Sequence, residues 1–105
     1  MTGAIVIFST APAALAGTIA RELVGRRLAA RVNMTPVRSI YRWQGEICDE
    51  PEQLMIIKTT RENEANALAA IRELHTYDVP EMIVLPVEGG YPPYLAWIRE
   101  ETGAR

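Results

Sequence analysis

Four side chains able to bind a metal or donate a proton lie within the stretch "HTYDVPE": His75, Tyr77, Asp78 and Glu81. A neutral imidazole and carboxylates are suitable ligands for a borderline divalent cation. His75, Asp78 and Glu81 therefore form a candidate metal site. His75 is the single histidine of the chain. It could instead cap the end of a helix or bond within the loop, with Pro80 fixing the exit, and the sequence leaves both roles open.

Other reactive side chains offer weaker chemistry. Cys48, Asp49 and Glu50 supply one soft and two hard ligands, but adjacent residues rarely converge on one ion, so we interpret them as a solvated turn. His75 is the one available imidazole base, and the chain contains no "GxSxG", P-loop or "GxGxxG" motif. We therefore expect no enzymatic activity.

The bulk composition limits the classes of partner and compartment. The 105 residues predict one domain, residues 1–105. A net charge of −2 argues against nucleic acid and anionic membranes as partners. No apolar stretch approaches the ~20 residues of a membrane span. The single cysteine, Cys48, allows no intrachain disulfide, which fits a reducing, cytoplasmic location.

The elements that must position these residues follow from hydrophobic periodicity. Strands are expected at 4–9, 31–37, 39–48, 54–59 and 82–87, and helices at about 12–27, 60–74 and 94–101. The segment "CDEPEQ", residues 48–53, is expected to be a polar turn. The order β-α-β-β-α-β plus a C-terminal helix predicts an α+β, ferredoxin-like fold with an antiparallel sheet and both main helices on one face.

The strand patterns also predict an oligomer. Apolar residues occupy both odd and even positions in three strands, "AIVIF", "LMIIK" and "MIVLP". Both faces of the sheet therefore need cover, and two helices cover only one. A homo-oligomer would bury the other face, because a large exposed apolar patch marks an interface. Tyr41 and Trp43 share one face of the 39–48 segment with Gly45 and Ile47, opposite Arg42. We expect Tyr41 and Trp43 to be covered by a neighbouring subunit.

Five segments in order, "RRLAARVN", "RSIYRWQGEI", "IIKTTRE", "ELHTYDVPEMIVLPV" and "YLAWI", resemble the CutA family of divalent-cation-tolerance proteins. The resemblance runs from about residue 4 to residue 100. It implies a ferredoxin-like protomer in a PII-like homotrimer and a role in divalent metal tolerance or homeostasis. It implies no obligatory cofactor, although a divalent cation such as copper could bind, and it does not identify a protein partner.

The PII-like arrangement suggests an alternative function, a sensor or scaffold with a ligand cleft between subunits. Arg42, Trp43, Lys58 and Tyr77 are the candidate cleft residues, and the two cations would contact a small anion. Ion pairing within the interface would explain the same two cations without a ligand. One departure from the family stands out: Arg31 occupies a position where the family usually has Cys, which removes a soft metal ligand.

Overall fold

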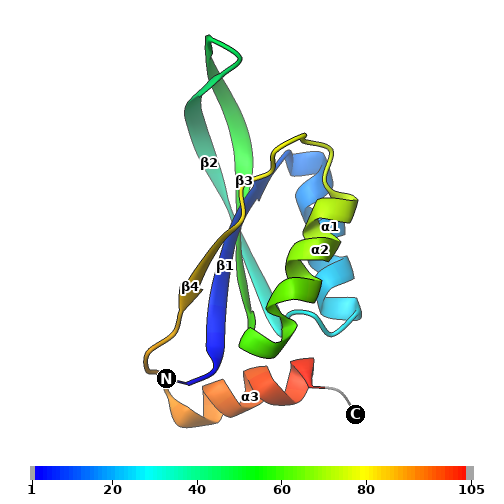
Figure 1. Cartoon of the computed structure of the whole chain (residues 1–105), viewed down its shortest axis with the longest axis vertical. Helices are drawn as coiled ribbons and strands as arrows, with labels where there is room; N and C mark the ends of the chain where they lie inside the picture. The colour runs from blue at the N-terminus through cyan, green and yellow to red at the C-terminus, as the bar shows by residue number, and fades with distance from the viewer. Residues whose placement is uncertain (1, 104–105) are drawn as a thin grey trace.

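The computed structural model describes residues 2–103, in which four antiparallel strands form one sheet in the order β2-β3-β1-β4 (Figure 1). This confirms the predicted α+β architecture with a C-terminal helix. The elements are β1 (Ala4–Ala11), α1 (Ala13–Gly25), β2 (Arg31–Trp43), β3 (Glu46–Thr60), a short 3-10 turn (Arg61–Asn63), α2 (Glu64–Leu74), β4 (Ile83–Pro86) and α3 (Pro92–Thr102).

Helices α1 and α2 cover one face of the sheet and form the main core with it (Figure 1). Alternate residues of β1 and β3 point to this face because side chains of a strand alternate between the two sides. Burying these aliphatic side chains is the main source of the chain's stability. The largest fully buried hydrophobic side chains are Ile5, Ile7, Met55 and Ile57 from the sheet and Ile19, Leu23 and Ile71 from the helices.

The opposite face of the sheet also carries apolar side chains. Val6 pairs with Leu85, and Phe8 pairs with both Ile56 and Ile83, so these five side chains share that face. Helix α3 covers its lower end through a smaller cluster around Ile98. Higher on this face Ile83 and Leu85 remain 50% and 42% exposed. The sheet is therefore apolar on both faces, as the strand patterns predict.

Strands β2 and β3 form a hairpin that extends beyond the helices (Figure 1). Its turn is Gln44–Gly45, and both residues have positive φ, 50° and 81°, as a type I′ turn requires. The predicted turn at residues 48–53 is wrong, because the whole segment belongs to β3. The turn also places Ile47 opposite Arg42, so Ile47 does not share a face with Trp43 as expected.

Two prolines are compatible with this long hairpin because each lies where a strand has a free side. Pro36 is in β2, which lies at one edge of the sheet. Pro51 is in β3, but β1 pairs with β3 only as far as Gln53, so β3 has a single neighbour at Pro51. Both prolines are therefore compatible with the strands that contain them.

Candidate functional site

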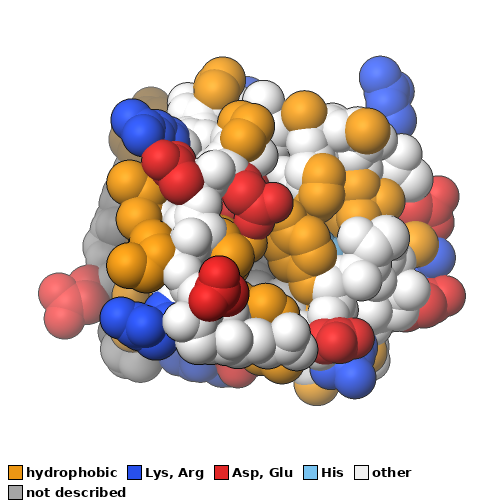
Figure 2. Space-filling view, turned by 90° about the horizontal axis from the view of Figure 1, so that it is seen from above, with side chains coloured by type: hydrophobic (Ala, Val, Ile, Leu, Met, Phe, Trp, Pro, Cys, Tyr) orange, Lys and Arg blue, Asp and Glu red, His pale blue; other side chains and the backbone are white. Residues whose placement is uncertain are grey.

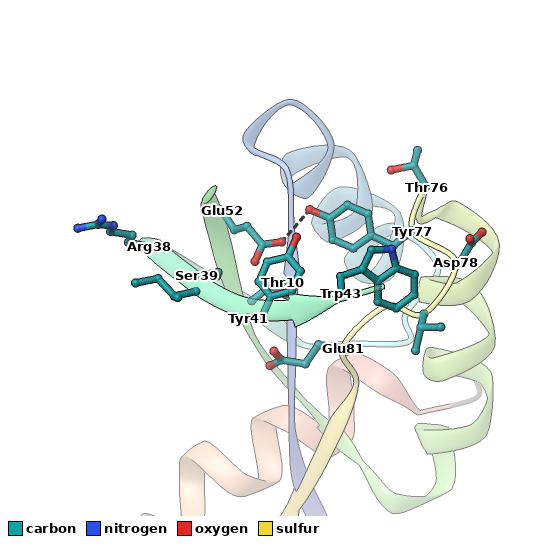
Figure 3. A pocket seen from close by; sticks show the side chains of 12 residues that line it. Thr10, Arg38, Ser39, Tyr41, Trp43, Glu52, Thr76, Tyr77, Asp78 and Glu81 are labelled. Carbon is teal, nitrogen blue, oxygen red and sulfur yellow. Dashed lines mark hydrogen bonds between the residues drawn. The ribbon is translucent and has the colours of Figure 1, made fainter. Parts of the chain in front are cut away.

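An open hollow of about 620 Å³ lies between the hairpin and the loop that follows α2 (Figure 3). Thr10, Glu52, Tyr41 and Trp43 reach it from the sheet face that α1 and α2 leave uncovered, because strand pairing gives these positions the same parity. The loop contributes the other side. The side chains that matter for its chemistry are Tyr41, Trp43, Glu52, Tyr77, Asp78 and Glu81, and we call this site the hollow.

His75 fastens the loop to the end of β1. Its Nε2 lies 2.7 Å from the Thr10 carbonyl oxygen, which can only accept, so Nε2 carries the proton and donates. The backbone N–H of Tyr77 donates to Nδ1 over 3.1 Å. The His75 and Tyr77 rings lie 4.4 Å apart, centroid to centroid. Both imidazole nitrogens are thus bonded to the backbone, which is the structural role that the sequence left open for His75.

Glu52 is the buried carboxylate of the hollow, only 7% exposed. Tyr77 donates its hydroxyl to Oε2 of Glu52 over 2.7 Å (Figure 3). Within residues 2–103, Oε1 accepts no hydrogen bond and Glu52 forms no ion pair. Burial and then the bond to Glu52 raise the pKa of Tyr77. A buried carboxylate therefore lacks a cationic partner at this point of the described chain.

Tyr41, on the hairpin side of the hollow, also lies beside carboxylates. Its hydroxyl donates to the Glu50 carboxylate, and this bond, together with burial and nearby charges that include Glu52, raises the pKa of Tyr41. Burial and nearby carboxylates therefore raise the pKa of both phenols. The view from the hairpin end shows acidic side chains near its centre, while the Lys and Arg side chains lie toward its edges (Figure 2).

Arg38 is the one cation among the described side chains that line the hollow, and its charge is already balanced. Its Nε and Nη2 donate to Asp49 over 2.9 and 2.6 Å, and the guanidinium points away from the other lining residues (Figure 3). The bond to Arg38 lowers the pKa of Asp49. Asp49 lies in a strand, so its predicted place in a solvated turn with Cys48 is wrong.

The structure separates the predicted metal ligands. Asp78 and Glu81 line the hollow, whereas His75 lies behind it with both nitrogens engaged. Among residues 2–103 no three His, Cys, Asp or Glu side chains come together in a way that could hold a metal ion. A metal site within one described chain is therefore incomplete.

The predicted cleft residues are also divided. Trp43 and Tyr77 line the hollow, but Arg42 and Lys58 do not. Arg42 has the opposite parity to Trp43 on β2. Lys58 pairs in register with Arg31 and donates to Asn33, and burial and then Arg31 lower the pKa of Lys58.

Arg31, the departure from the usual family Cys, packs against α3. Its guanidinium carbon lies 6.0 Å from the Tyr94 ring centroid and 5.8 Å from that of Trp97. The two rings stack on each other at 5.5 Å. These contacts are within the range of cation–π attraction, so the aromatic face of α3 accommodates the charge. The position supplies a packed cation and no thiolate.

The antiparallel sheet, the helices on one face and the projecting hairpin define a chain of the PII-like α+β class. The solved PII-like protein CutA from Nostoc shares this fold, with a TM-score of 0.91, 33% identity, and coverage of 94% of this chain and 97% of the Nostoc chain. CutA from Xylella fastidiosa aligns with a TM-score of 0.93 and 41% identity, over 96% of this chain and 99% of its own.

The family model described as CutA1 divalent ion tolerance protein matches residues 4–101. The divalent-cation tolerance protein CutA of Thermus thermophilus is 43% identical over 100 residues, which cover 94% of this chain and 97% of that protein. The mouse protein CutA is 46% identical over 89 residues, 84% of this chain. The chain therefore belongs to the CutA family, and this confirms the resemblance seen in the sequence.

The matched region spans about half of the length of the mouse relative, 50%. Over residues 2–103, none of the helices has the length and apolar character needed to cross a membrane.

Proposed function

We propose that this protein is a trimeric divalent-cation-tolerance protein that binds cations such as copper without catalytic turnover. The observation that carries the proposal is the charge of the hollow. Glu52, Asp78 and Glu81 line it, and the one lining cation, Arg38, is neutralised by Asp49. A concave site with one sign of charge concentrates ions of the opposite sign. The family's association with divalent cations supports the same conclusion.

The trimer is supported by the uncovered sheet face and by the aromatic side chains at the hairpin. Tyr41 and Trp43 are 38% and 41% exposed in the single chain, and Ile83 and Leu85 of β4 are exposed as well. Sedimentation should give about three times the 11.7 kDa chain mass. A monomer at micromolar concentration would overturn this part of the proposal.

Because one chain lacks a complete ligand set, the proposed metal site takes its further ligands from a neighbouring subunit or from water. Calorimetric titration with Cu(II) and Zn(II) tests it. The double variant Asp78→Asn/Glu81→Gln should weaken binding at least tenfold, while Glu88→Gln, an exposed carboxylate outside the hollow, serves as the matched control. Equal affinity of the double variant and the wild type would remove the hollow as the metal site.

The second candidate is a PII-like sensor in which the hollow takes a small ligand. Its volume of about 620 Å³ falls within the range of small-molecule sites. The sequence favoured an anionic ligand because it grouped Arg42 with Lys58, but neither lines the hollow. A ligand of the hollow in one chain would therefore be cationic. A thermal-shift screen against cationic and anionic metabolites in chelator separates this sensor from a metal-binding protein.

We also propose a cytoplasmic location, supported by the lone cysteine. A CutA relative of known structure from Archaeoglobus fulgidus is described as periplasmic, so fractionation of the native host is a direct test. Recovery of the protein in the periplasmic or secreted fraction would overturn the proposal.

A further inference from the structure

Glu52 is buried in a way that calls for a cation. At 7% exposure the Glu52 side chain has lost much of its hydration, and hydrogen bonds or an opposite charge offset such a loss. Oε1 is not among the fully enclosed atoms without a partner, so it stays open to a group that enters the hollow. The Tyr77 hydroxyl satisfies one oxygen, Oε2. No described donor bonds to Oε1, and no Lys, Arg or His side chain of residues 2–103 pairs with Glu52. The unused capacity of this carboxylate faces the hollow.

The aromatic lining indicates what kind of cation fits. Tyr41, Trp43 and Tyr77 stand around the same space as Glu52 (Figure 3). Aromatic faces attract ammonium and guanidinium groups through the quadrupole of the ring, and Trp is the strongest of them. A bare divalent metal would need several oxygen, nitrogen or sulfur ligands that converge, and residues 2–103 offer no such cluster. An organic cation needs one carboxylate and apolar rings, which are present.

We propose that the hollow binds a small organic cation, an amine or guanidinium compound, whose charged head donates to Glu52 and lies against the rings of Trp43 and Tyr77. Because Oε1 is free to accept, a head group with N–H donors is favoured over a quaternary ammonium group. The volume of about 620 Å³ leaves room for an uncharged body beside the head. This inference rests on the sensor candidate above and is independent of the metal proposal.

Methylguanidinium and N-methylurea provide a matched pair of probes, because they have nearly the same shape and differ in charge. Each is titrated into the native oligomer in buffer with chelator, and the two tryptophan indole N–H signals are followed by NMR. Trp43 lines the hollow, whereas Trp97 belongs to α3 and packs in the cluster around Ile98, so it acts as an internal control. We expect a saturable shift of the Trp43 signal with methylguanidinium, at least tenfold weaker binding of N-methylurea, and a steady Trp97 signal.

The variant Glu52→Gln keeps the side-chain shape and an acceptor for Tyr77, and it should weaken methylguanidinium binding at least tenfold. Glu88→Gln should bind like the wild type. Equal responses to the two probes, or no saturable Trp43 shift, would overturn the proposal. If a side chain of a neighbouring subunit fills the hollow, no saturable Trp43 shift will be seen. The comparison of probes needs only the wild-type protein, so it holds even if Glu52→Gln does not fold.

Metal titration of the same sample without chelator keeps the two proposals separate. Saturable metal binding without a response to methylguanidinium would overturn the organic-cation inference alone. A response to methylguanidinium without metal binding would overturn the metal proposal alone.

Discussion

The hydrogen bond from Tyr77 to Glu52 makes the substitution Tyr77→Phe informative for stability. The phenyl ring keeps the contact with His75 but loses the hydroxyl that bonds to the carboxylate over 2.7 Å. A hydrogen bond to a charged group contributes about 1.5–3 kcal/mol. Tyr77 is half-buried, so water can partly replace the lost donor, and we take the lower part of that range. The expected loss in the free energy of unfolding is about 1.5–2 kcal/mol.

Urea denaturation at a single protein concentration measures this loss. Guanidinium salts are unsuitable, because their cation belongs to the class that we propose for the hollow. Constant concentration matters because subunit association adds to the apparent stability. Tyr91→Phe is the matched control: Tyr91 is 73% exposed and its hydroxyl forms no bond within the described residues, so its removal should change stability by less than about 0.5 kcal/mol.

A double-mutant cycle with Glu52→Gln isolates the pair. Once the acceptor is neutral, removing the Tyr77 hydroxyl should cost only about 0.5–1 kcal/mol. The reasoning fails if Tyr77→Phe lowers the free energy of unfolding by less than about 0.5 kcal/mol in the wild-type background, because a hydrogen bond to a charged group normally contributes more than that.

The pH dependence of the same pair has a defined sign. The pKa of Tyr77 in the folded state lies above its ordinary value of 10.0, so the phenol contributes to stability below pH ~10 and this contribution is lost as the pH rises further. Tyr77→Phe should therefore reduce the alkaline loss of stability. A slope above pH ~10 that is identical in the wild type and Tyr77→Phe would contradict the assigned cause.

Three further outcomes follow from other contacts. Ser9→Ala should leave stability unchanged or raise it by up to about 1 kcal/mol in urea unfolding, since the buried Ser9 hydroxyl has no partner among the described residues; a clear loss would mean that the hydroxyl is bonded. Asp49→Asn should cost little because the Arg38–Asp49 pair is exposed. The lowered pKa of Asp49 means that the pair's contribution is present above pH ~4 and is lost as the pH falls through the folded value, so the variant should flatten that acid slope. Tyr41→Phe should leave the ordinary phenol ionisation near pH ~10 unchanged in an ultraviolet pH titration and remove only a late-ionising phenol, and a loss of signal in the ordinary range would refute the bond to Glu50.

The order of elements and the two-sided character of the sheet could be predicted because burial constrains both. The alternation in β1 sends Ile5 and Ile7 toward the helices and Val6 and Phe8 to the other face, and every one of these positions must be apolar. The beginning of β3, residues 48–53, escaped prediction for the opposite reason. Most of residues 48–53 are polar and not buried, Glu52 being the exception, so the segment resembles a turn in the sequence, whereas the positive φ angles of Gln44 and Gly45 mark the real turn.

The same misplaced turn hid the central residue of the hollow. Tyr77, Asp78 and Glu81 were found because reactive side chains in one loop stand out in a sequence. Glu52 was missed because a carboxylate in a supposed solvated turn attracts no attention. Counting back by twos from Leu54 along a continuous strand would have placed Glu52 on the uncovered face, close to the end of β1.

Register also explains why the anionic ligand of the alternative sensor hypothesis does not fit the hollow of the described chain. The PII-like resemblance grouped Arg42 and Lys58 with Trp43 in a cleft between subunits. Arg42 precedes Trp43 directly in β2 and so points to the other side of the strand, as the sequence already indicated, and the pairing of β2 with β3 sets Lys58 beside Arg31, away from the hollow. What reaches the hollow is Glu52 and the aromatic rings. A slip of one residue in this ladder would exchange the two faces, so the sign of the ligand charge is decided by strand pairing, which composition does not reveal.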